Sequence, residues 1–81
     1  MNIESIKDVY FRVMDNYVLT RTNKVFSSYE RAYTAGAYRT AENCLSLLMN
    51  SKSFDLFRTE TAFRIAKNHD LSFSLVYNMI Y

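Results

Sequence analysis

The sequence predicts an all-α domain, and two observations support that prediction. The 81 residues contain no proline and one glycine, whereas sheet-rich folds need these residues in their tight turns. Apolar residues also recur every three or four positions over most of the chain, which is the spacing of one face of an amphipathic helix. We therefore expect residues 1–81 to form a single helical domain, a small bundle of about four helices.

The first helix is expected to be long and to begin after Asn2, a residue that favours the N-cap position. Its apolar stripes are Ile3, Ile6, Tyr10, Val13 and Tyr17, and then Met14, Val18, Val25, Tyr29 and Ala32. These stripes favour one helix to about Ala35, or two collinear helices. The alternative is a break near Thr20–Asn23, where β-branched residues and Asn lower the helix propensity.

The glycine, Gly36, predicts the end of that helix, because glycine is preferred just after a helix C-terminus. A second helix with Tyr38, Ala41, Leu45 and Leu48 on one face would then fold back and make a helical hairpin at Gly36. The stretch YERAYTAGAYRTAENCLSLL resembles one tetratricopeptide repeat, which would imply protein binding. Such repeats need about three stacked copies and no second copy follows, so an ordinary hairpin is the favoured interpretation.

A third helix is expected to follow Asn50–Ser53, with Ser51 or Ser53 as its N-cap. Its inward residues are predicted to be Phe54, Phe57, Thr61, Ala62, Ile65 and Ala66. A turn at Asn68–Asp70 follows, and Ser72 is expected to cap a short last helix. Leu71 would pack on the buried side of that helix as a hydrophobic staple.

The segment Arg64–Ile80 resembles a helix-turn-helix, which implies DNA binding. The residues that would contact nucleic acid are Ser72, Ser74, Tyr77 and Asn78. Asn78 has the donor and acceptor that pair with an adenine edge, and the serines suit phosphate or base edges. Two departures weaken this interpretation: His69 and Asp70 replace the usual glycine of the turn, and the last helix carries no Arg or Lys. The nearest cations, Arg58, Arg64 and Lys67, precede it.

Charge and reactive residues give no sign of chemistry. The net charge of +2 neither requires nor excludes a nucleic-acid partner. Cys44 is expected to be a small core or boundary residue, and His69 a polar turn residue. The sequence has no metal-ligand spacing and no glycine-rich phosphate loop, so we expect no catalytic, metal-binding or cofactor-binding residue and no enzyme activity.

The aromatic content points to a protein partner. Seven Tyr and six Phe exceed what so small a core holds, so some are expected on the surface or covered by a different protein or a second copy of the chain. The N-terminal stretch, interrupted by charges, has neither the apolar core of a signal peptide nor a membrane-spanning run. We therefore expect a soluble, cytoplasmic protein.

Two segments, MNIESIKDVYFRVMD and KSFDLFRTETAFRIAKNHDLSF, are similar to the rIII lysis-inhibition proteins of T-even coliphages. The resemblance implies a small antiholin in the host cell cytoplasm. Such a protein binds the cytoplasmic N-terminal segment of the phage holin and delays host lysis (lysis inhibition). The resemblance does not identify which residues of this chain would bind the holin. The alternative function is that of a helix-turn-helix transcriptional regulator.

Overall fold

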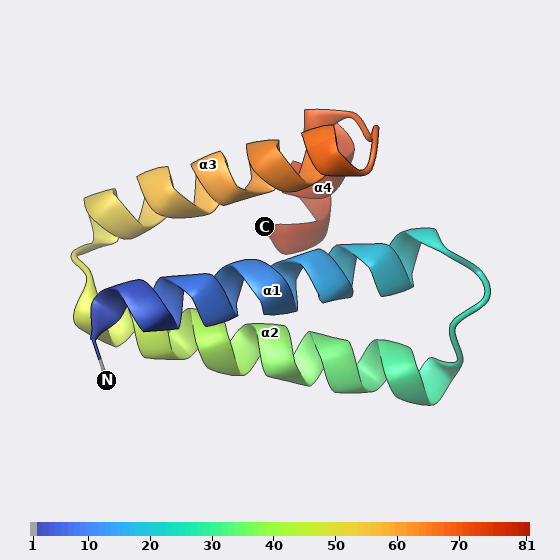
Figure 1. The fold of residues 1–81 in the computed structure, drawn as a ribbon, viewed down its shortest axis with the longest axis horizontal. Coiled ribbons are helices and arrows are strands. Elements are labelled where there is room, and N and C mark those ends of the chain that lie inside the picture. Colours follow the sequence, from blue (N-terminus) through green and yellow to red (C-terminus); the bar gives the residue numbers. More distant parts are fainter. Residues whose placement is uncertain (1) are drawn as a thin grey trace.

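The computed structural model of the chain describes residues 2–81. Helix α1 spans Ile3–Thr22, α2 Ser28–Leu48, α3 Ser51–Asn68 and α4 Phe73–Ile80. The first three helices lie side by side and alternate in direction, and the short α4 turns back at the end of α3 (Figure 1). The all-α fold of four helices is therefore confirmed, and no strand occurs in the described part of the chain. Within it, no helix combines the length and apolar character needed to cross a bilayer.

The connection between the first two helices lies earlier than predicted. Helix α1 ends at Thr22, so the helix to about Ala35 or the collinear pair is wrong, and the alternative break near Thr20–Asn23 is correct. Ser27 then begins α2 with a capping box, in which its hydroxyl accepts the Glu30 N–H and the Glu30 carboxylate accepts the Ser27 N–H. As a result, α1 and α2 form an antiparallel hairpin (Figure 1).

The hairpin predicted at Gly36 is wrong, because this glycine lies inside α2. Residues 29–48, which the sequence suggested as a helix pair, belong to one continuous helix. A Cβ at Gly36 would meet no atom within 4 Å, and the residue does not adopt a positive φ. Neither the backbone nor the packing within the chain therefore requires glycine, although glycine within a helix costs roughly 0.5–1 kcal/mol relative to alanine.

One core joins all four helices. Its buried apolar side chains are Tyr10, Met14, Tyr17, Val18, Tyr38, Leu45, Phe54, Ala62, Ile65, Ala66, Val76 and Ile80. The inward face predicted for α3 is confirmed, with Phe57 half-buried. The second predicted stripe is wrong beyond Val18, because Val25 and Tyr29 are 71% and 78% exposed. These two residues follow the break, where the helical phase of α1 no longer applies.

The turn between α3 and α4 closes with a Schellman motif. The Leu71 N–H donates to the Ala66 carbonyl at 2.8 Å, and the Asp70 N–H donates to the Lys67 carbonyl at 3.4 Å. Asp70 has a φ of 55°, a left-handed conformation that Asp tolerates better than most residues. The predicted turn is therefore present, and Asp70 takes the place that glycine has in a helix-turn-helix.

Short polar side chains cap the helix N-termini. The predicted caps Asn2 and Ser72 are confirmed, since each side chain accepts a backbone N–H three residues later. The cap of α3 is Asn50, so the prediction of Ser51 or Ser53 is wrong. The N-cap of this helix thus lies one residue before the earlier of the two predicted serines.

His69 joins the end of α3 to the first helix. It is the C-cap of α3, and its Nε2 lies 2.5 Å from Oδ1 of Asp15 on α1. The prediction of a polar turn residue is therefore confirmed. The contact links residues 54 positions apart and ties the turn before α4 to the rest of the bundle.

Replacing Gly36 with Ala is expected to raise the free energy of unfolding by roughly 0.5–1 kcal/mol, because alanine restricts the unfolded backbone and its methyl group enters open space. Urea denaturation followed by circular dichroism at low protein concentration measures the change. A fall in stability would show instead that the position requires glycine, as a turn would.

Candidate functional site

The four residues predicted to contact nucleic acid all lie at α4 and are exposed: Ser72, Ser74, Tyr77 and Asn78. The Ser72 hydroxyl oxygen accepts the Leu75 N–H at 3.2 Å, so it serves the helix as its cap. The other three lie within α4, whose eight residues include no Arg or Lys. The structure therefore brings the predicted residues together on a surface without positive charge of its own.

Four aromatic residues make a chain of ring contacts across α3 and α4, which we call the aromatic ladder: Phe63, Phe73, Tyr77 and Tyr81. The ring centroids are 4.8 Å apart for Phe63–Phe73, 5.5 Å for Phe73–Tyr77 and 4.2 Å for Tyr77–Tyr81. Phe63 and Tyr81 are 60% and 51% exposed. The ladder therefore holds α4 against α3 and also presents apolar ring surface to solvent.

Of the three cations nearest to the last helix, Arg58 and Arg64 lie against aromatic rings, whereas Lys67 is exposed on α3. The guanidinium of Arg64 is 4.3 Å from the ring centroid of Phe11, and that of Arg58 is 3.8 Å from the ring centroid of Tyr81. Arg58 also pairs with Glu42, at 3.0 Å. Both guanidinium groups are therefore engaged by side chains of the same chain.

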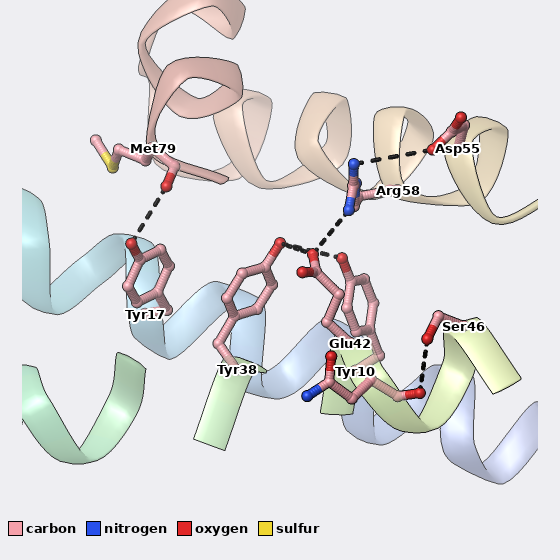
Figure 2. Close-up of polar contacts among 9 residues, drawn as sticks. Tyr10, Tyr17, Tyr38, Glu42, Ser46, Asp55, Arg58 and Met79 are labelled. Atoms are coloured by element: carbon pink, nitrogen blue, oxygen red, sulfur yellow. Dashed lines mark hydrogen bonds and ion pairs between the residues drawn. The ribbon is translucent and has the colours of Figure 1, made fainter. Parts of the chain in front are cut away.

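A part-buried polar network connects α1, α2 and α3 (Figure 2). The Tyr38 hydroxyl and Nη1 of Arg58 both donate to Oε2 of Glu42, at 2.8 and 3.0 Å. Because Tyr38 uses its only proton in this way, the Tyr10 hydroxyl must donate to the Tyr38 oxygen, 3.3 Å away. Figure 2 also shows Arg58 reaching Asp55, at 3.8 Å.

Burial raises the pKa of both tyrosine hydroxyls in this network. For Tyr38, the neighbouring Tyr10 and Glu42 raise the pKa further. For Tyr10, the charge of Glu42 raises the pKa further, and the charge of Arg58 opposes the increase only in part. Both hydroxyls therefore keep their protons at neutral pH and act as hydrogen-bond donors. We interpret the network as a structural contact that stabilises the packing of α1, α2 and α3.

A second apolar surface lies between α1 and α2. An open hollow of about 700 Å³ is lined by these two helices alone, and another of about 330 Å³ continues from it, with Tyr33 lining both. We call the two hollows together the α1–α2 groove. On the α1 side, the groove is lined by the apolar side chains of Val9 and Val13. On the α2 side, it is lined by the small residues Gly36 and Ala37.

Cys44 lines this groove and is exposed, so its prediction as a core or boundary residue is wrong. The next residue, Leu45, is fully buried. Because successive residues of a helix point about 100° apart, the same turn of α2 that buries Leu45 directs Cys44 away from the core.

The predicted surplus of aromatic residues is confirmed, since Tyr29, Tyr33, Phe63 and Tyr81 are all at least half exposed. The ladder and the groove themselves were not predicted. A signal for the groove is present in the sequence, as Ala32, Gly36, Thr40 and Cys44 follow one another at intervals of four. In the ladder, Phe73, Tyr77 and Tyr81 also follow one another at intervals of four. The contact between Phe63 and Phe73 has no such signal, because it crosses the turn between two helices.

Comparisons with protein-family models, with curated proteins and with solved structures find no match for this chain. A functional proposal therefore depends on the geometry of the two apolar surfaces and on the sequence resemblance given above.

The raised pKa values predict that the protein loses stability at alkaline pH. The unfolded chain releases the Tyr10 and Tyr38 protons near the ordinary value of 10.0, whereas the folded chain retains them. The stabilisation is complete below that pH and is lost as the pH rises above it, at up to about 1.4 kcal/mol per pH unit for each tyrosine. Urea denaturation on both sides of this pH measures the loss.

Tyr10→Phe and Tyr38→Phe are each expected to make this dependence on pH shallower. Tyr29→Phe, which removes a hydroxyl from a side chain that is 78% exposed, is the matched control. An alkaline slope that is the same in Tyr38→Phe as in the unmodified protein would contradict the prediction.

Proposed function

We propose that the protein is a non-enzymatic regulator that acts by binding another protein. The observation that supports this most directly is the exposed aromatic ladder on α3 and α4. Interfaces between proteins are enriched in Tyr and Phe and depleted of charge at their centres. The ladder offers such a centre, because α4 carries no Arg or Lys and the guanidinium of Arg58 is drawn onto Tyr81 and Glu42.

The resemblance to the lysis-inhibition proteins supplies a partner for this proposal. In it, the chain is a cytoplasmic antiholin, and the partner is the cytoplasmic N-terminal segment of a phage holin. Binding withholds the holin from assembly and delays lysis of the host. Two of the ladder rings, Phe63 and Phe73, lie within the longer of the two segments that carry the resemblance. An amphipathic helix laid on exposed rings is the binding mode that the ladder suits.

A pull-down with the holin segment tests this function. The unmodified protein is expected to be retained at micromolar concentrations. The double substitution Phe63→Ala and Tyr77→Ala is expected to weaken binding at least tenfold, or about 1.4 kcal/mol, since central aromatic residues dominate interface energies.

Val25→Ala is the matched control, because Val25 is 71% exposed in the loop between α1 and α2 and lies outside the ladder. Circular dichroism of each variant establishes that the fold is kept. No retention of the unmodified protein at micromolar concentrations would reject the holin as the partner.

DNA binding is the second candidate function. In its favour, α3, the turn and α4 follow the order of a helix-turn-helix, and Ser74, Tyr77 and Asn78 are exposed on its last helix. It is less well supported than protein binding, because phosphate contacts supply much of the affinity for DNA and α4 offers no cation for them.

This function predicts binding to duplex DNA that weakens steeply as salt concentration rises. Asn78→Ala is expected to relax the base preference at one position and to cost about 1–3 kcal/mol. A mobility-shift assay at low salt provides the measurement, and an absence of any shift there would eliminate this candidate.

A further inference from the structure

The α1–α2 groove presents a row of small residues along α2. Ala32, Gly36, Thr40 and Cys44 recur at intervals of four, so they share one face of the helix, and all four are exposed. The space beside Gly36 is empty of atoms from the chain itself. A helix from outside can therefore approach the backbone of α2 more closely here than larger side chains would allow.

We propose that a second copy of the chain fills the α1–α2 groove, with α2 packed antiparallel against α2 of the partner copy. The small-residue row is symmetric about position 38. A two-fold axis through that position pairs position 32 of one copy with position 44 of the other, and position 36 with position 40. This self-complementarity is what a two-fold interface requires, because the same patch must serve both subunits.

The exposed apolar area on this face is close to what a stable dimer needs. Val9, Tyr29 and Tyr33 at the groove are 43%, 78% and 69% exposed. Leu47, which continues the α2 face one turn beyond Cys44, is 87% exposed. Each of the two tyrosines buries roughly 150–250 Å² when it is covered, and with the two aliphatic side chains the exposed area is on the order of 600 Å², against ~800 Å² per partner in a standard interface.

The two-fold axis also pairs the large exposed residues at the two ends of the small-residue row. It brings the Tyr29 end of one α2 against the Leu47 end of the other, so that a large exposed ring meets an exposed aliphatic side chain at both ends. The charged residue lining the groove, Glu30, lies near its outer end, away from the axis. The aromatic ladder lies on α3 and α4, so a dimer formed in this way carries two free ladders.

Disulfide formation tests the arrangement. Within one helix, positions 32 and 44 are about 18 Å apart, far beyond the roughly 4.4–6.8 Å between Cα atoms that a disulfide spans. A bond between Cys44 and a cysteine introduced by Ala32→Cys must therefore join two chains. We expect the Ala32→Cys protein to form a disulfide-linked dimer rapidly under mild oxidation.

Two matched proteins complete this test. The unmodified chain and the double variant Ala32→Cys, Cys44→Ala each have one cysteine, which the two-fold axis holds about 18 Å from its copy. Both are expected to cross-link much more slowly. Rapid cross-linking of the unmodified chain through Cys44, with no gain from Ala32→Cys, would overturn the antiparallel arrangement.

Light scattering after size exclusion supplies an independent readout. The unmodified protein is expected to have twice the 9.6 kDa mass of one chain, and Gly36→Leu is expected to have the mass of one chain. We expect the leucine to leave the monomer folded, because its Cβ meets no atom of the chain, and to block the approach of the second helix.

Lys52→Leu, at an exposed position on α3, is the control and is expected to remain dimeric. Circular dichroism distinguishes loss of the dimer from loss of the fold. A monomeric unmodified protein at high concentration, or a dimeric Gly36→Leu protein, would overturn the proposal.

Discussion

The side chain of Glu42 is the constraint on which the arrangement of the helices depends. Its carboxylate accepts hydrogen bonds from Tyr38 on its own helix and from Arg58 on α3, and Tyr38 in turn accepts one from Tyr10 on α1. A buried polar group that loses its partner costs about 1–3 kcal/mol. Sliding one helix along another would break several of these bonds at once, so the network selects one register where apolar contacts alone would permit several.

The aromatic residues of the chain divide into a buried set in the core and an exposed set on the surface. The interior is filled by a few large side chains, among them Tyr10, Tyr17 and Phe54, and little room remains for further rings. The exposed aromatic residues lie on the ladder or along the α1–α2 groove. Arg58 and Arg64 lie against rings, which supports the proposal of an apolar protein partner over a phosphate-bearing one.

The sequence predicts the parts of this fold that depend on local chemistry. Helical spacing identified four helices, and the caps Asn2 and Ser72 were correct because capping involves neighbouring residues only. The prediction of a helix end at Gly36 was wrong. Glycine is common just after a helix C-terminus, but here it lies inside helix α2. The start of α2 had its own signal, the capping box from Ser27 to Glu30, which begins four residues after the end of the weak stretch Thr20–Asn23. The width of the groove and the contact between Phe63 and Phe73 depend on how two helices pack against each other, which spacing alone does not specify.

The shortness of α4 gives the ladder a property of its own. Eight residues are too few to stay helical in isolation, so α4 depends on the buried Val76 and Ile80 and on the bond from the Tyr17 hydroxyl to the Met79 carbonyl. When α4 detaches, the ladder ceases to exist as a surface. The affinity of any ligand that needs the assembled rings is then scaled by the fraction of time for which α4 stays docked. The contact between Asp15 and His69 holds the turn before α4. A substitution there would therefore change the affinity of such a ligand without touching it.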